Sequence, residues 1–242
     1  MSAWLADLLA ERGENIVLMQ EGDERIPCDF CFTAGIPKNI FETLCDEHNF
    51  NKGVLYKIAL TTENYVYIRI DKCDENVAEI IKKYDMGEET NQFISVADYA
   101  ACFIERLKHW VDSHIGNDDI VVMENGYLQG PINEMFFRGA SDDEVRNFIG
   151  DITKHMLPLN PICIYLRRES ADAAINFAKK AKGKEWAEAI ENMLKQKEWE
   201  NFFGRRFDLE HEMLKNIEHL DCFVDGYNWD DAKEKIILCG LC

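Results

Sequence analysis

Acidic side chains follow two apolar segments of this sequence, at positions where they could bind a metal ion or accept a proton. Glu124 comes directly after the run 120–123, and Glu21 and Asp23 follow the run 16–19. Such runs predict buried strands, and open α/β sheets place ligand-binding residues beyond the carboxyl ends of their strands. Carboxylate oxygens suit hard cations such as Mg²⁺ and can take a proton from a hydroxyl group. The alternative for all three residues is a solvated turn or loop position after a strand.

Basic side chains gather after a third apolar segment, where they could bind phosphate. Arg167 and Arg168 follow the run 161–166, and a planar guanidinium group can contact a phosphate through two parallel hydrogen bonds. The helix pattern that comes next carries Lys179, Lys180, Lys182 and Lys184. The alternative is an exposed helix face whose positive charges are balanced by nearby acids. Those acids are Glu169, Asp172, Glu185 and Glu188.

The elements that would position these residues follow an α/β pattern. Apolar periodicity predicts a helix over 2–12 and a strand over 16–19. Further strands are predicted over 120–124, 161–166 and 220–224. Further helices are predicted near 132–139, 142–157, 170–181, 184–197, 198–218 and 229–238. Continuous apolar strands of this kind fit a parallel sheet that helices cover on both faces.

The segment at about 27–115 has a different pattern and is interpreted as an insertion. A short helix is predicted over 38–48, and two strands over 54–60 and 65–70 form an antiparallel hairpin. Helices over 76–84 and 96–115 complete the insertion. Mixed helices and strands of this kind predict an α+β insertion within a single domain spanning 1–242.

Four segments, taken in order, resemble the P-loop nucleoside/nucleotide kinase-like family. They are Glu-Gly-Asp at 21–23, Val-Val-Met-Glu-Asn-Gly-Tyr-Leu-Gln-Gly-Pro at 121–131, Pro-Leu-Asn-Pro-Ile-Cys-Ile-Tyr-Leu at 158–166, and the basic segment after it. The resemblance covers nearly the whole chain. It implies a three-layer fold in which helices flank a parallel sheet, and phosphoryl transfer from ATP with Mg²⁺ to a small acceptor such as a nucleoside or nucleotide.

The resemblance also implies roles for the charged residues. Glu124 would organise Mg²⁺, and Glu21 would orient or deprotonate the acceptor, with Asp23 as its possible substitute. Arg167 would steady the transferring phosphoryl group. Contacts to the phosphates of the cofactor would come from Arg168, Lys179, Lys182 and Lys184. The insertion would shape the acceptor pocket, with Phe30, Phe32, Tyr56 and Tyr99 as possible walls.

The sequence departs from this family because it contains no phosphate loop of the form G-x-x-x-x-G-K-[ST]. Its Gly183-Lys184 pair is followed by Glu185, and Ala178 stands where the earlier glycine should be. We expect that the chain begins about one strand and one loop late, and that it is inactive as it stands. The alternative is a non-catalytic interaction or remnant protein that retains the scaffold.

The missing first strand would lie centrally in the family's sheet, between the strands predicted at 120–124 and 161–166. Unpaired backbone groups cost roughly 1–3 kcal/mol each when they are buried, against a total stability of about 5–15 kcal/mol for a domain. We therefore expect a chain that is unstable or rearranged, or that closes the gap by pairing these two strands directly.

Composition limits the partners and the compartment. The chain has 45 acidic and 27 basic residues and a formal charge of −18, which disfavours nucleic acids and anionic membranes. Nine cysteines at irregular spacings, with no long apolar span, favour the cytoplasm. Cys28-x-x-Cys31 and Cys239-x-x-Cys242 leave a zinc-stabilised module as a third possibility, which their wide separation disfavours.

Overall fold

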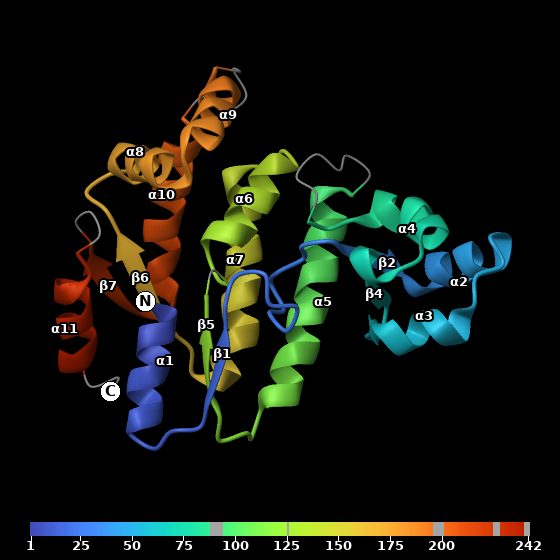
Figure 1. Ribbon diagram of the computed structural model, residues 1–242, viewed down its shortest axis with the longest axis horizontal. Helices are drawn as coiled ribbons and strands as arrows, with labels where there is room; N and C mark the ends of the chain where they lie inside the picture. Colours follow the sequence, from blue (N-terminus) through green and yellow to red (C-terminus); the bar gives the residue numbers. More distant parts are fainter. Residues whose placement is uncertain (88–93, 125, 196–200, 225–227, 240–242) are drawn as a thin grey trace. The chain divides into compact units, whose positions relative to one another are not determined.

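The computed structural model describes residues 1–87, 94–124, 126–195, 201–224 and 228–239, whose helices and strands are shown in Figure 1. The chain packs as two compact units. The central unit is Val17–Asn160, and the terminal unit combines Met1–Ile16 with Pro161–Cys242.

The central unit is organised around a two-stranded sheet and helices that bury a common core. The sheet pairs β1 (Ile16–Met19) with β5 (Ile120–Met123). The helices are α5 (Val96–His114), α6 (Gln129–Phe137) and α7 (Asp142–Met156). Phe103 of α5 meets Phe148 of α7 edge-on, with ring centroids 4.9 Å apart. Both rings are buried, so this contact fixes the pairing of the two helices (Figure 1).

The insertion forms its own antiparallel sheet within the central unit. Its strands lie in the order β2 (Thr33–Pro37), β4 (Tyr65–Arg69) and β3 (Ala59–Thr61). The helices that accompany it are α2 (Lys38–Glu47), α3 (Lys52–Ile58) and α4 (Glu75–Ile81). Its core contains Ala34, Ile36, Phe41, Leu44, Cys45, Leu55, Val66, Ile68, Val77 and Ile81. The predicted antiparallel hairpin is confirmed, because β3 pairs with β4.

The prediction of a strand over 54–60 is wrong for most of its length, because α3 occupies 52–58. The side chain of Asn51 accepts a hydrogen bond from the Val54 amide at 3.2 Å and so caps the start of the helix. Only Leu55 is buried in α3, whereas Val54 and Ile58 are 53% and 38% exposed. The apolar run therefore has a single buried position, which a short helix satisfies as well as a strand would.

The terminal unit contains a two-stranded parallel sheet of β6 (Ile162–Arg167) and β7 (Glu218–Phe223). Its helices are α1 (Ser2–Glu11), α8 (Ala171–Lys182), α9 (Lys184–Leu194), α10 (Phe202–Met213) and α11 (Asp230–Leu238). Buried side chains come mainly from α10, α1 and α11, including Leu209, Leu5 and Ile236. Neither α8 nor α9 has a buried residue among its described positions.

The chain is thus a mixed α/β protein, as predicted. The strands expected to share one parallel sheet are divided between the β1-β5 and β6-β7 pairs. Short 3₁₀ turns follow several elements at Ile70–Lys72, Lys82–Tyr84, Leu157–Leu159 and Leu214–Asn216. Within the described ranges, none of the helices combines the length and apolar character needed to cross a membrane.

Candidate functional site

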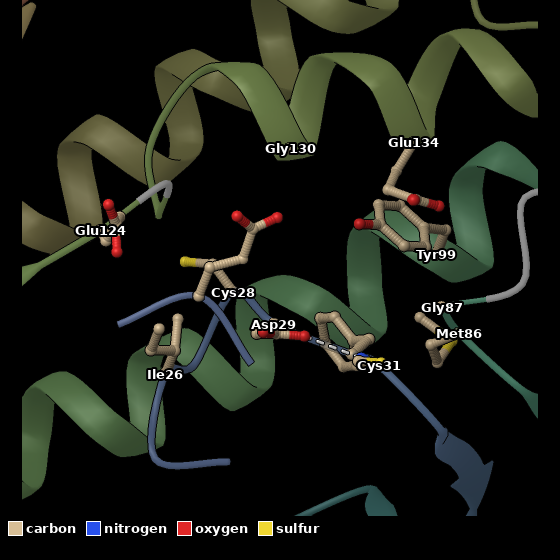
Figure 2. A pocket seen from close by; sticks show the side chains of 12 residues that line it. Ile26, Cys28, Asp29, Cys31, Met86, Gly87, Tyr99, Glu124, Gly130 and Glu134 are labelled. Atoms are coloured by element: carbon tan, nitrogen blue, oxygen red, sulfur yellow. Dashed lines mark hydrogen bonds between the residues drawn. The ribbon is translucent and has the colours of Figure 1, made fainter. Parts of the chain in front are cut away.

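The central unit contains a cavity of about 320 Å³ whose walls combine acidic, aromatic and sulfur-containing side chains (Figure 2). It is lined by Glu21, Ile26, Cys28, Asp29, Phe30, Cys31, Met86, Gly87, Tyr99, Glu124, Gly130 and Glu134. Its volume falls at the small end of the range of ligand pockets. All of these residues belong to the central unit, which therefore forms the cavity by itself.

The sheet brings the predicted residues Glu21 and Glu124 to this cavity. The backbone amide of Glu124 donates to the carbonyl oxygen of Met19 at 2.9 Å, so β1 and β5 end side by side. Glu21 follows β1 by two positions and Glu124 follows β5 directly. Within the described residues, neither carboxylate has a hydrogen bond or ion pair, so both can interact with a ligand.

The loop after β1 is held in shape by Asp29. Its carboxylate accepts hydrogen bonds from the amides of Gly22 at 2.9 Å and Cys31 at 2.8 Å. The buried guanidinium of Arg106, on α5, donates to two carbonyl oxygens of the same loop, those of Asp29 at 2.7 Å and Glu24 at 3.1 Å. These contacts fix the part of the loop that lines the cavity.

A second wall is built by Tyr99 of α5 and Glu134 of α6. Glu134 forms an ion pair with Arg138 at 2.5 Å, and the Arg138 guanidinium lies 4.2 Å from the centre of the Tyr99 ring. Arg138 also donates to the carbonyl oxygen of Met86 at 2.8 Å. The Tyr99 hydroxyl points into the pocket, on the side opposite Glu124 (Figure 2).

The Tyr99 hydroxyl is a polar group at the cavity wall that makes no hydrogen bond within the described residues. Tyr99 is 1% exposed, and its hydroxyl has no hydrogen-bond partner in the part of the chain that the structure describes. Burial and the nearby Glu134 carboxylate raise the pKa of Tyr99 well above its usual value. The group is therefore a hydroxyl donor at any physiological pH, directed at the space where a ligand would lie.

Asp23, predicted as a possible substitute for Glu21, does not line the cavity. Arg25 binds its carboxylate through Nε at 2.9 Å and Nη2 at 2.5 Å. This hydrogen bonding lowers the pKa of Asp23. Asp23 is thus a partner of Arg25 at the surface of the loop.

The predicted phosphate-binding cations lie in the terminal unit, where each has a local partner. Arg167 donates through Nε to both carboxylate oxygens of Asp221, at 2.7 and 2.8 Å. The guanidinium of Arg168 lies 3.4 Å from the centre of the Phe177 ring. Two of the lysines form ion pairs, Lys179 with Glu191 at 2.9 Å and Lys184 with Glu188 at 3.5 Å. The ammonium group of Lys182 lies 5.3 Å from the centre of the Trp186 ring.

Metal ligands are sparse in the described residues. No three side chains of His, Cys, Asp or Glu come together there in a group that could hold a metal ion. Cys28, Cys31 and Cys239 are free thiols, and burial raises the pKa of Cys28 to about 12. Cys242, the fourth member of the zinc alternative, lies outside the described residues.

Sequence patterns identified part of this lining and missed the rest. Of the aromatic walls proposed, Phe30 and Tyr99 line the cavity, whereas Phe32 and Tyr56 do not and are 56% and 37% exposed. Asp29 and Glu134 were missed. Glu134 stands four residues before Arg138 on α6, which the sequence shows only as an ordinary helical ion pair.

Comparisons with protein-family models, with curated proteins and with solved structures found no match for this chain. The motifs in the sequence and the cavity of the central unit are therefore the observations from which a function can be proposed.

Proposed function

We propose that this chain provides the acceptor site of a P-loop-type small-molecule kinase with a three-layer fold. The reaction would transfer the γ-phosphoryl group of ATP to a hydroxyl or phosphate group of a nucleoside or nucleotide. The observation that supports this proposal is that Glu21 and Glu124, both unpaired among the described residues, line one cavity from adjacent strand ends. An acceptor and a metal-bound phosphate must meet at such a place in this chemistry.

In this proposal Glu21 binds the acceptor hydroxyl and takes its proton as the oxygen attacks phosphorus. The carboxylate lies on an exposed stretch after β1, where it retains access to ligand and solvent. Catalysis would come mainly from positioning the two reactants, since phosphoryl transfer requires little covalent chemistry from the protein. Asp29 and Arg106 contribute by fixing the loop behind the acceptor.

The residues present suit a magnesium ion held chiefly by its nucleotide. Mg²⁺ keeps several waters and is often bound by one or two carboxylates together with phosphate oxygens. Glu124 offers one such carboxylate at the cavity wall. When bound, the ion would neutralise charge on the phosphate groups.

The phosphates themselves need further contacts. The 242 residues contain no G-x-x-x-x-G-K-[ST] loop, so a loop from outside them would have to bind the nucleotide. Arg167, Arg168, Lys179, Lys182 and Lys184 of the terminal unit are proposed as phosphate-binding cations, and each would exchange its present partner for phosphate. The bidentate pair of Arg167 with Asp221 is the contact most comparable to one with phosphate.

Equilibrium binding of nucleosides and nucleotides to the 242-residue chain tests the acceptor site without requiring a phosphate loop. We expect Glu21→Gln to weaken binding of the acceptor about tenfold, because a hydrogen bond to a charged group contributes roughly 1.5–3 kcal/mol. Glu47→Gln, on the exposed carboxyl end of α2, is the matched control and should leave affinity unchanged.

Glu124→Gln separates the two acidic roles. It should leave acceptor affinity within about twofold of the parent while weakening the binding of Mg²⁺. If neither nucleosides nor nucleotides bind the chain at millimolar concentration, the kinase proposal fails and the non-catalytic scaffold becomes the better account.

A further inference from the structure

The charge of the cavity restricts which acceptor it can hold. Acidic side chains line it at Glu21, Asp29, Glu124 and Glu134. None of the described residues that line it is a lysine, arginine or histidine. Like charges repel strongly where protein walls exclude part of the solvent, so a ligand that carries phosphate would be disfavoured in this space.

The nearest cations are engaged with the walls. Arg138 pairs with Glu134, which leaves Glu21, Asp29 and Glu124 as the acids that would repel a phosphate. Arg106 is 7% exposed and donates to backbone carbonyl groups of the loop, beneath the Phe30 ring at 4.7 Å. The Arg138 side chain is 2% exposed and contacts Glu134, Met86 and the Tyr99 ring. Each guanidinium would have to break buried contacts before it could reach a ligand phosphate, which is costly.

The opposite wall adds a neutral recognition group. Tyr99 is 1% exposed, and its hydroxyl has no partner in the described part of the protein and points into the cavity (Figure 2). An unsatisfied donor of this kind needs an acceptor such as a carbonyl oxygen or ring nitrogen. The Phe30 ring, whose centroid is 6.1 Å from that of Tyr99, supplies apolar lining near it. A planar, uncharged ligand portion fits this end of the cavity.

From these features we infer that the cavity takes an uncharged nucleoside-like acceptor and excludes the corresponding monophosphate. Glu21 binds a hydroxyl group of the ligand, and the Tyr99 hydroxyl donates to an acceptor atom on its planar part. The inference rests on the proposed function and decides between the two acceptor classes, nucleoside and nucleotide, that the motifs leave open.

The test compares nucleosides with their 5′-monophosphates in calorimetric titrations of the full chain at low ionic strength, with EDTA present to remove divalent cations. We expect at least one nucleoside to bind and its monophosphate to bind at least about tenfold more weakly. The difference should shrink at high salt and in the Glu124→Gln protein, because both changes reduce the repulsion.

Equal or tighter binding of the monophosphate would overturn the inference while leaving the proposed function intact. Absence of binding by both classes would overturn the proposed function and, with it, this inference.

Tyr99→Phe tests the neutral end, with Tyr67→Phe as the matched control. Tyr67 is also buried, but its hydroxyl donates to the carbonyl oxygen of Cys102 at 2.7 Å. We expect Tyr99→Phe to lower nucleoside affinity about fivefold without lowering the melting temperature, since no internal hydrogen bond is lost. Tyr67→Phe should lower the melting temperature and leave affinity within about twofold. An unchanged affinity in Tyr99→Phe would overturn the role given to its hydroxyl.

Discussion

Gly87 shows how closely the backbone packs at the edge of the cavity. A Cβ atom built on Gly87 would lie 2.5 Å from the carbonyl oxygen of Phe30 and 2.9 Å from its carbonyl carbon. Both of these atoms belong to the backbone, so a side chain rotation cannot relieve the contact. Glycine at this position therefore allows the loop that carries Phe30 to approach the turn after Met86.

We predict that Gly87→Ala lowers the free energy of unfolding by about 1–3 kcal/mol, because the Phe30 backbone must shift to admit the methyl group. Urea denaturation measures this change. Gly150→Ala is the matched control in the same unit. A Cβ there has no neighbour within 4 Å, and the residue lies in α7. Alanine at that position should stabilise the protein by about 0.5–1 kcal/mol. If the two substitutions changed the free energy of unfolding equally, the close approach of Gly87 to the Phe30 backbone would be contradicted.

At the residue scale, the sequence predicted cavity residues only where an acidic side chain follows a predicted strand. Glu21 and Glu124 could be predicted because each follows an apolar run. Asp29 and Glu134 could not, since their relation to the cavity depends on long-range contacts. Arg106 of α5 donates to the carbonyl oxygen of Asp29, and Arg138, the ion-pair partner of Glu134, donates to the carbonyl oxygen of Met86. No local pattern encodes these contacts.

The contact between β6 and α10 contains a buried carboxylate outside the cavity. Glu210 is 5% exposed and accepts a hydrogen bond from the Tyr165 hydroxyl at 2.6 Å. Arg206 lies 3.2 Å from its other oxygen, and the neighbouring His211 also faces it. Desolvation dominates over these contacts and raises the pKa of Glu210 above the ordinary value of 4.5.

The raised pKa of Glu210 makes stability depend on pH in a defined direction. Because the folded protein holds this proton more tightly than the unfolded chain, its contribution to stability is complete below pH 4.5 and is lost as pH rises through the folded pKa. We predict that Glu210→Gln, which is neutral throughout, becomes more stable relative to the parent as pH rises from 4.5 to 8.

Denaturation curves at several pH values measure this difference, and Glu218→Gln, at an exposed position of β7, is the control. A difference between parent and Glu210→Gln that stays constant over this pH range would show that Glu210 does not titrate abnormally.

At the element scale, the order and type of most helices and strands followed from the sequence. The strand over 16–19 has the predicted bounds, and α5 ends within one residue of its predicted end. The prediction of secondary structure was wrong at two segments, where the residues buried in the fold differ from those that the apolar pattern indicated. The run 54–60 forms mostly helix, and β2 was missed because Gly35 and Pro37 in its five residues are typical of turns. Its residues become a strand through pairing with β4.

At the scale of the whole molecule, charge is the dominant feature. The formal charge of −18 means that carboxylates repel one another across the surface, and folding concentrates them. We predict that raising the salt concentration from about 20 to 300 mM increases the melting temperature by a few degrees, because the screening length shortens. NaCl and KCl at equal ionic strength should act alike. A fall in melting temperature with either salt would show that repulsion between the carboxylates does not dominate the effect of salt on stability.

The same melting experiments bear on the sheet. The strands predicted to flank a missing central strand form two separate two-stranded pairs. We therefore still expect low stability for the chain, and a cooperative melt at high temperature with clean monomeric behaviour would count against that expectation.

The acidic lining of the cavity also affects how readily the product of the proposed reaction would leave. A neutral acceptor enters without opposing charge, but the phosphate ester formed from it carries negative charge into a wall that includes Glu21, Asp29 and Glu124. The repulsion that would exclude monophosphates as substrates would then promote departure of the product. If the proposed reaction takes place, product release would not limit turnover, and the product would inhibit the reaction little.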